Sequence, residues 1–273
     1  MKKHLLDLTV TGVERLTDRH VLIRLTHEEL LPEALPGQFV EVRIDEEPSV
    51  FLRRPISINH IDRERNELWL LVATIGKGTR RLGGLQVGDK LNCLLPLGNS
   101  FKVADEAALA PGRQVLLVGG GVGMAPMYFL GKALREKGVQ PTFLLGARTA
   151  SEVLLIDRFR ELGEVCVTTE DGSMGEQGFV TNHSVLARPP FCANYSEADG
   201  ARPYVACCGP KPMMVAVARW AKAHGIECEV SLENMMACGL GACLCCVEKT
   251  VRGNLCVCKD GPVFNINDLL WQI

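Results

Sequence analysis

The chain has 273 residues, which is enough for two domains and a small additional module. Its 47% hydrophobic and 23% charged residues are typical of a globular protein and exclude intrinsic disorder. A formal net charge of −2 gives no electrostatic basis for binding nucleic acid or an anionic membrane. The apolar stretch near Met1 is too short for a secretory signal, and no apolar run approaches the roughly 18 residues of a membrane span. We therefore expect a cytoplasmic protein.

Residues 1–103 are expected to form a small antiparallel β-barrel. Short segments of alternating or apolar character are separated by turn signals, among them residues 21–25, 38–42, 68–72 and 90–95. Five or six strands at this spacing are typical of such a barrel.

Two motifs in this region indicate a bound flavin. Arg54 is followed by Pro55, Ile56 and Ser57 on an extended segment, so the guanidinium and the hydroxyl can face one ligand. A turn at residues 76–79 adds backbone N–H groups and a hydroxyl that suit phosphate oxygens. Each motif alone is also compatible with an exposed strand and a hairpin turn, but their combination favours the flavin.

Residues 104–228 are expected to form a parallel sheet that is covered on both faces. Continuous apolar runs alternate with helical segments, and this pattern is typical of an α/β domain. The runs lie at residues 114–118, 142–145, 165–168 and 204–207, and the clearest helices are expected near 126–138 and 212–225. The polar segment 185–202 predicts a surface loop.

A glycine-rich loop follows the first of these strands. Gly120, Gly121 and Gly123 permit close backbone approach, and the following helix N-terminus attracts a pyrophosphate. The next strand continues into residues 146–148 without the acidic residue that usually binds a ribose diol. Arg148 is therefore either a surface charge or a contact for the 2′-phosphate of NADP.

A second turn, Cys208-Gly209-Pro210, follows the strand at residues 204–207. The small thiol and the glycine are compact enough to admit a nicotinamide ring beside another ring. The alternative is a simple strand-to-helix turn in which proline marks the boundary.

Residues 229–273 form a cysteine-rich module. Cys238, Cys243 and Cys246 are spaced C-x4-C-x2-C, and Cys258 follows, which is the plant-type ferredoxin pattern for a [2Fe–2S] cluster. Glycines between the first two cysteines let the loop fold closely over a cluster. Zinc usually prefers paired short spacings, and inert buried thiols are an unsatisfactory explanation for so dense a group. Cys245 and Cys256 also compete as ligands.

These motifs together resemble the ferredoxin–NADP reductase superfamily. The cysteine loop, residues 258–264 and the segment 171–175 are similar to the electron-transfer subunits of dihydroorotate dehydrogenase B. The resemblance implies that FAD is held by Arg54, Pro55, Ile56, Ser57, Leu71, Val72, Ala73, Gly78 and Thr79. It also implies that Cys238, Cys243, Cys246 and Cys258 bind the cluster, and that Cys245 and Cys256 do not.

The same resemblance implies a function in pyrimidine (UMP) biosynthesis. An FMN-containing catalytic subunit would oxidise dihydroorotate, and electrons would pass through the [2Fe–2S] cluster and FAD to NAD+ in a heterotetramer of two of each chain. No side chain of this chain is expected to act as a nucleophile or general base. The alternatives are a subunit of a sulfide dehydrogenase, a subunit of an NADH-dependent ferredoxin:NADP oxidoreductase, or a non-enzymatic iron–sulfur sensor.

Overall fold

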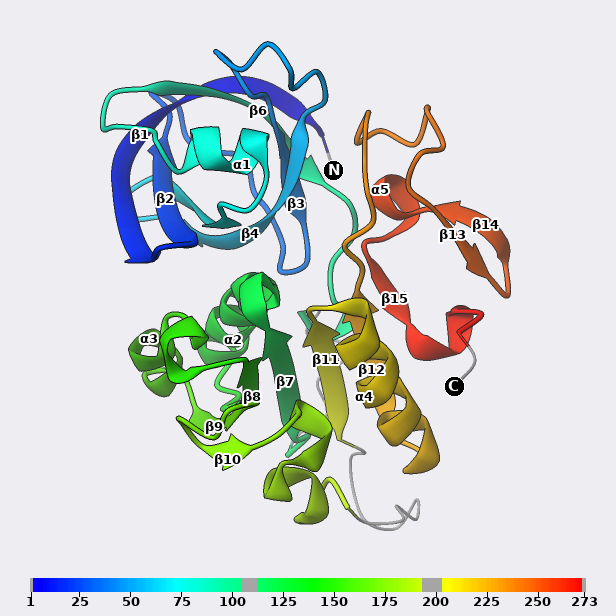
Figure 1. The fold of residues 1–273 in the computed structure, drawn as a ribbon. Helices are drawn as coiled ribbons and strands as arrows, with labels where there is room; N and C mark the ends of the chain where they lie inside the picture. The colour runs from blue at the N-terminus through cyan, green and yellow to red at the C-terminus, as the bar shows by residue number, and fades with distance from the viewer. Residues whose placement is uncertain (1, 105–111, 193–202, 272–273) are drawn as a thin grey trace.

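Six antiparallel strands close the N-terminal barrel in the computed structural model, which describes residues 2–104, 112–192 and 203–271 (Figure 1). The order around the barrel is β1–β2–β5–β4–β3–β6. Val21, Ile23 and Leu25 alternate into the interior, which is why this segment forms a strand. The expected barrel is confirmed. Its elements are β1 (His4–Thr17), β2 (His20–Thr26), β3 (Phe39–Val42), β4 (Arg54–Asp62), β5 (Glu67–Ala73), α1 (Lys77–Leu82) and β6 (Lys90–Leu97), with a 3-10 turn at Lys102–Ala104.

A seven-stranded sheet forms the second part of the molecule, in the order β10–β9–β8–β7–β11–β12–β15. Its first six strands are parallel to their neighbours, and β15 pairs antiparallel with β12 at one edge. The strands are β7 (Val115–Gly120), β8 (Thr142–Ala147), β9 (Glu164–Thr169), β10 (Glu176–Gln177), β11 (Tyr204–Cys208), β12 (Glu227–Ser231) and β15 (Val263–Asn265). The helices are α2 (Met124–Glu136), α3 (Ile156–Arg160) and α4 (Lys211–Ala223). Short 3-10 turns lie at Gly121–Gly123, Ala150–Glu152, Val180–Asn182 and Ser184–Ala187.

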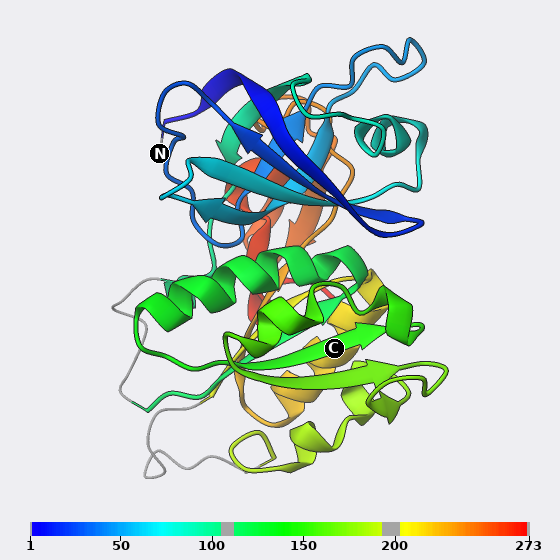
Figure 2. The same ribbon diagram turned by 90° about the vertical axis from the view of Figure 1, so that its left-hand side faces the viewer.

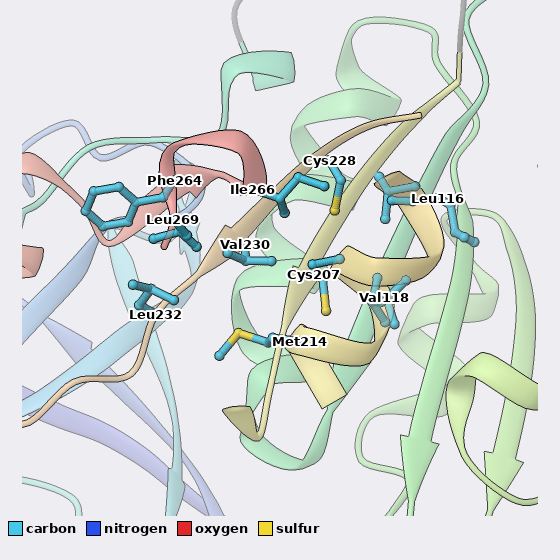
Figure 3. Packing of buried hydrophobic residues seen from close by; sticks show 14 of the residues in the cluster. Leu116, Val118, Cys207, Met214, Cys228, Val230, Leu232, Phe264, Ile266 and Leu269 are labelled. Atoms are coloured by element: carbon cyan, nitrogen blue, oxygen red, sulfur yellow. The ribbon is translucent and has the colours of Figure 1, made fainter. Parts of the chain in front are cut away.

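The continuous apolar run in β7 is explained by helices on both faces of the sheet. Val115 and Leu117 pack with α2, whereas Leu116 and Val118 pack with α4 on the opposite face (Figure 3). Helix α2 itself lies between the sheet and the barrel (Figure 2). None of the helices in the described part of the chain is long and apolar enough to cross a membrane.

The predicted surface loop at residues 185–202 is wrong for its first part. Val185, Leu186 and Phe191 are buried in the same apolar cluster as α4, although their sequence neighbours are polar. Burial of three such side chains outweighs the polar character of the segment. Residues 193–202 lie outside the described residues.

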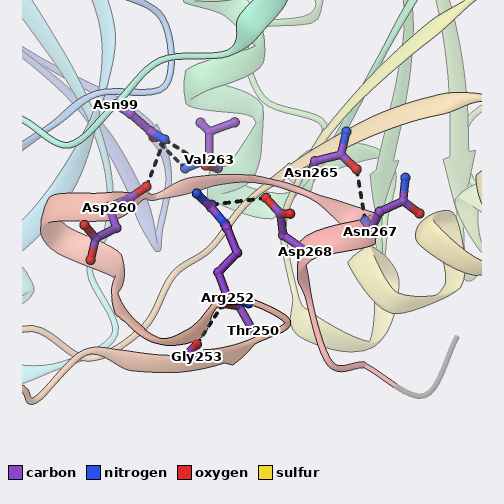
Figure 4. A network of polar contacts seen from close by, with 9 residues as sticks. All are labelled: Asn99, Thr250, Arg252, Gly253, Asp260, Val263, Asn265, Asn267 and Asp268. Carbon is purple, nitrogen blue, oxygen red and sulfur yellow. Dashed lines mark hydrogen bonds and ion pairs between the residues drawn. The ribbon is translucent and has the colours of Figure 1, made fainter.

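The C-terminal module is joined to both other parts. It contains the hairpin β13 (Val247–Thr250) and β14 (Gly253–Cys256), the helical turn α5 (Val257–Asp260), strand β15 and a 3-10 turn at Ile266–Asp268. Asn99, just after β6, donates to the backbone oxygens of Asp260 at 3.1 Å and Val263 at 2.9 Å (Figure 4). Phe264, Ile266 and Leu269 enter the apolar cluster beneath α4, and each contributes about 1.5–3 kcal/mol of burial free energy (Figure 3).

An aromatic cluster connects the barrel to α2. His60 of β4 lies edge-on to Trp69 of β5 at 5.3 Å between ring centroids, and to Tyr128 and Phe129 of α2 at 6.0 Å each. His60 is buried, and this burial lowers the pKa of its imidazole to about 4. The Nδ1 atom of His60 has no hydrogen-bond partner in the described residues.

Because of the lowered pKa of His60, the protein should lose stability in acid. Because the folded-state pKa lies below the value of 6.5 in the unfolded chain, the unfolded chain binds a proton first as pH falls. The stabilisation is present above pH 6.5 and is lost as pH falls toward 4, by up to about 3 kcal/mol. The variant His60→Phe keeps the ring packing without the proton, so its unfolding free energy should fall less between pH 7 and pH 4.

Urea unfolding at several pH values measures this difference. The control His4→Phe removes a partly exposed histidine from the start of β1 and should keep the wild-type pH dependence. Equal slopes for the wild type and His60→Phe would show that His60 is not the group responsible.

Candidate functional site

One cavity brings together most of the predicted flavin residues. It has a volume of about 220 Å³ and lies between β4, β5 and the segment after β12. Of the predicted residues, its walls contain Pro55, Ile56, Ser57, Leu71, Val72, Ala73 and Thr79. Residues that the sequence did not single out complete it, including Phe39, Ile75 and Met236.

Arg54 and Gly78 lie next to each other beside this cavity. A Cβ atom on Gly78 would lie 3.1 Å from the Arg54 Nε atom, so a larger residue would press on the guanidinium. The expected turn at residues 76–79 is in fact the start of α1, and the Thr79 hydroxyl accepts from the Gly76 N–H at 3.0 Å. The two predicted flavin motifs are therefore adjacent in space.

A larger cavity of about 710 Å³ lies at the carboxyl ends of the parallel strands. Gly120, Gly121 and Pro210 line it, as the two predicted loops require. This edge is where open α/β sheets bind ligands, and the volume suits a dinucleotide.

Gly123 and Gly209 lie where the loop after β7 packs against the loop after β11. A Cβ atom on Gly123 would lie 2.3 Å from the Cys208 carbonyl oxygen, and a Cβ atom on Gly209 would lie 3.1 Å from the Gly120 nitrogen. Gly209 also has a φ of +154°, which side chains rarely adopt. The loops after β7 and β11 therefore approach so closely that only glycine is accommodated.

Glu233 connects the two cavities and was not predicted from the sequence. Its side chain lines both of them, and the Cys208 thiol donates weakly to its Oε1 atom at 3.9 Å. Desolvation within the cleft raises the pKa of this carboxyl group. The available signal was its position immediately after β12, at the carboxyl edge of the parallel strands.

The dinucleotide cavity also contains acidic residues that the sequence pattern did not reveal. Glu152 comes from the 3-10 turn after β8, and Glu170 follows the end of β9. Acidic side chains thus reach this cavity from segments other than the end of β8. Arg148 lines the same cavity and forms an ion pair with Glu152.

The four predicted cluster cysteines lie in two pairs. Cys243 contacts Cys238, and the Cys258 backbone N–H donates to the Cys246 sulfur at 3.4 Å. Within residues 2–104, 112–192 and 203–271, no group of three or more His, Cys, Asp or Glu side chains is arranged to hold one metal ion. Each iron of a [2Fe–2S] cluster takes two of the four thiolates. The paired donor set suits the two-iron cluster.

Backbone N–H groups of the loop point at these sulfurs. Leu240 donates to the Cys238 sulfur at 3.3 Å, and Gly241 donates to the Cys258 sulfur at 3.1 Å. The Leu240 N–H is the main reason that the pKa of Cys238 falls to about 6. Gly239 and Gly241 have φ values of +67° and +81°, which the close folding of the loop requires. Such donors stabilise negative charge on a cluster.

The thiols of Cys245 and Cys256 are hydrogen-bonded to backbone oxygens. The Cys245 thiol donates to the Met235 carbonyl oxygen at 3.7 Å, and the Cys256 thiol donates to the Gly241 carbonyl oxygen at 3.8 Å. Cys258 is nearly completely buried, in a segment held by Asn99 of the barrel.

The fold is shared with solved reductase structures. The chain matches a structure from a study of the NADH-dependent reduced ferredoxin-NADP oxidoreductase with a TM-score of 0.82 and 29% identity, over 97% of this chain and 90% of the other. Phthalate dioxygenase reductase shares the fold alone, with a TM-score of 0.61 and 19% identity over 80% of this chain and 64% of the other. The fold and the site define the chain as an electron-transfer oxidoreductase of the ferredoxin–NADP reductase type.

Sequence comparison identifies the family. Residues 117–219 match the oxidoreductase NAD-binding domain, and residues 233–270 match the iron–sulfur cluster binding domain of dihydroorotate dehydrogenase B. The dihydroorotate dehydrogenase B (NAD(+)) electron transfer subunit of Bacillus caldolyticus is 36% identical over 96% of this chain and 97% of its own length. The protein of that name from Lysinibacillus sphaericus (strain C3-41) is 39% identical over 87% and 88%, respectively. The chain belongs to this family of electron transfer subunits.

Proposed function

We propose that the chain passes electrons from an FMN-containing dihydroorotate dehydrogenase subunit, through a [2Fe–2S] cluster and FAD, to NAD+ in pyrimidine (UMP) biosynthesis. The assembly is a cytoplasmic heterotetramer of two of each chain. The observation that carries the proposal is the spatial order of the three sites: the dinucleotide cavity, the flavin cavity and the cysteine loop. The flavin cavity shares Val122 and Glu233 with the dinucleotide cavity, and its lining also includes Met236 and Pro262, which flank the cluster cysteines in the sequence.

Three functional domains follow from this proposal. They comprise an FAD-binding barrel at residues 1–103, an NAD-binding domain at 104–228 and a cluster-binding module at 229–273. The limit between 228 and 229 falls inside β12, and β15 of the module completes the same sheet. The module is thus structurally continuous with the NAD-binding domain.

The proposed roles of individual residues follow from their positions. Arg54 and Gly78 hold the FAD pyrophosphate, and Pro55 to Ser57, Leu71 to Ala73 and Thr79 enclose the rest of the cofactor. Gly120, Gly121 and Gly123 hold the pyrophosphate of NAD, and Cys208, Gly209 and Pro210 leave room for its nicotinamide. FAD, when bound, supplies the conversion between a two-electron hydride and single electrons. Cys238, Cys243, Cys246 and Cys258 hold the cluster.

A second candidate is favoured by the TM-score of 0.82 to the structure from the study of the NADH-dependent reduced ferredoxin-NADP oxidoreductase. In that case, as for a sulfide dehydrogenase subunit, the fold and the cofactors would be the same and the partner would differ. Relatives with 36–39% identity over most of the chain carry the dihydroorotate dehydrogenase name, and this favours the first proposal.

The partner can be tested with purified proteins under anaerobic conditions. Alone, the chain should reduce artificial dyes with NADH and should not oxidise dihydroorotate. Mixed with an FMN-containing dihydroorotate dehydrogenase subunit, it should form a stable complex that reduces NAD+ with dihydroorotate, measured at the NADH absorbance. Failure to form this complex, together with NADP+ reduction by ferredoxin or a sulfur compound, would support the second candidate.

Substitution of the exposed leucines in the cysteine loop tests whether the partner subunit covers this loop. Leu240 and Leu244 are 48% and 64% exposed beside the cluster cysteines, so the partner subunit should cover them. The double variant Leu240→Glu/Leu244→Glu should lower the affinity of the two subunits at least about tenfold, because the interface would then bury two carboxylates. Val87→Glu, at a 71% exposed position of the barrel, is the control and should assemble normally.

A further inference from the structure

The two ends of the dinucleotide cavity differ in chemistry. Glu233 lies at the end that adjoins the flavin cavity, and the Cys208 thiol before Gly209 and the cavity-lining Pro210 contacts it there. Arg148, Glu152 and Glu170 lie at the other end, formed by the segments after β8 and β9. The glycine-rich loop after β7 lies between them, since β7 is placed between β8 and β11 in the sheet.

This order determines the direction in which a dinucleotide binds. The nicotinamide must reach the flavin cavity, and the pyrophosphate lies at the glycine-rich loop. The adenosine ribose therefore lies at the end that contains Arg148, Glu152 and Glu170. The 2′ position of this ribose, a hydroxyl in NAD and a phosphate in NADP, is where the two cofactors differ.

Arg148 is paired with its neighbour Glu152 at this end. Its Nε atom donates to Oε2 of Glu152 at 2.9 Å, and its Nη2 atom donates to Oε1 of the same carboxylate. The side chain of Glu152 is 23% exposed and that of Arg148 is 60% exposed, so the carboxylate is the more enclosed member of the pair. Both donors on the Nε/Nη2 edge of the guanidinium are thus already used, so a 2′-phosphate would have to displace Glu152 to make a bidentate contact on that edge.

Glu170 adds a second carboxylate beside the pair. Its backbone N–H donates to the Ala147 oxygen at 3.1 Å, and the N–H of Asp171 donates to the Arg148 oxygen at 3.2 Å. These bonds hold the end of β9 against the end of β8. One cation and two carboxylates then face the ribose, and this balance disfavours a dianionic phosphate and favours a hydroxyl donor.

We propose that the Arg148–Glu152 ion pair, with Glu170, selects NAD(H) against NADP(H). Glu152 withholds the guanidinium from a 2′-phosphate, and the carboxylates accept hydrogen bonds from the ribose hydroxyls. This inference rests on the proposed function of the cavity as the NAD site and specifies its cofactor preference.

Binding of two redox-inactive ligands tests the inference without a turnover assay. ADP-ribose and 2′-phospho-ADP-ribose share the pyrophosphate and differ at the ribose 2′ position. Calorimetric titration of the full chain, loaded with FAD and cluster, should show tighter binding of ADP-ribose. In Glu152→Gln, binding of 2′-phospho-ADP-ribose should strengthen on the order of tenfold, since the freed guanidinium gains a charge-assisted contact. Adding Arg148→Gln to this variant should abolish the gain.

The control is Asp157→Asn, which breaks the exposed Asp157–Arg160 ion pair on α3. Neither residue of this pair lines the cavity. It should leave both affinities unchanged. The inference is overturned if the wild type prefers the 2′-phosphate, if Glu152→Gln leaves the affinity ratio unchanged, or if it weakens both ligands equally. Absence of binding of either ligand to the wild type would instead refute the cavity as the NAD site, and the inference with it.

Discussion

Replacing Cys258 with serine should give a protein that retains FAD but contains no iron–sulfur cluster. Cys258 is nearly completely buried, its backbone N–H donates to the Cys246 sulfur, and its own sulfur receives the Gly241 N–H. A serine oxygen is a harder and shorter ligand than a thiolate, so the cluster would lose one of its four anchors. Iron and sulfide analysis of anaerobically purified protein should give about two of each per chain in the wild type and almost none in the variant.

Two neighbouring cysteines provide the controls for this experiment. Cys245→Ser and Cys256→Ser should keep the visible and electron paramagnetic resonance spectra, because their thiols are directed at the carbonyl oxygens of Met235 and Gly241. A cluster retained in Cys258→Ser and lost in Cys256→Ser would reassign the fourth ligand. Stoichiometric zinc without iron in the wild type would refute the cluster itself.

Changing Gly123 to alanine should weaken NADH binding strongly. The new Cβ atom would lie 2.3 Å from the Cys208 oxygen and 2.5 Å from its carbonyl carbon. Both are backbone atoms, which cannot rotate away, so the loops after β7 and β11 must separate. The expected cost is about 1–3 kcal/mol of stability, and the affinity for NADH should fall at least about tenfold.

Calorimetric titration with NADH and thermal unfolding measure the two effects. Gly12→Ala is the control, because its Cβ atom would have only an ordinary contact of 3.8 Å with Arg24. It should keep the wild-type affinity for NADH. Wild-type affinity in Gly123→Ala would mean that the junction of the two loops does not position the nucleotide.

Local patterns in the sequence were sufficient to predict the barrel, the parallel sheet and the loops that follow β7 and β11. Alternation at Val21–Leu25 gives a barrel strand, and the unbroken run at Val115–Val118 gives a strand covered on both faces. These features depend on neighbouring residues and on the period of the secondary structure. The roles of individual cofactor residues remain predictions until they are tested by substitution.

Features that depend on distant segments were not predictable in this way. Glu41 alternates with apolar residues in β3 and by that pattern should face solvent, yet it is completely buried. A Cβ atom on Gly239 would lie 2.8 Å from the Glu41 side chain, so the cysteine loop covers this face of the barrel. The burial raises the pKa of Glu41 to about 7. The connection of two cavities by Glu233 likewise depends on tertiary structure.

The position of β15 has a consequence for biosynthesis. The six barrel strands are contiguous in the chain and can pair while later residues are still being translated. The central sheet cannot be completed at that stage, because β12 has an open edge until Val263–Asn265 leave the ribosome. Phe264, Ile266 and Leu269 also cover the apolar face beneath α4 only then. Maturation of the nucleotide-binding sheet is thus coupled to arrival of the segment that follows Cys258, the proposed last cluster ligand. A prematurely terminated chain would expose both the edge and the apolar face to chaperones and proteases.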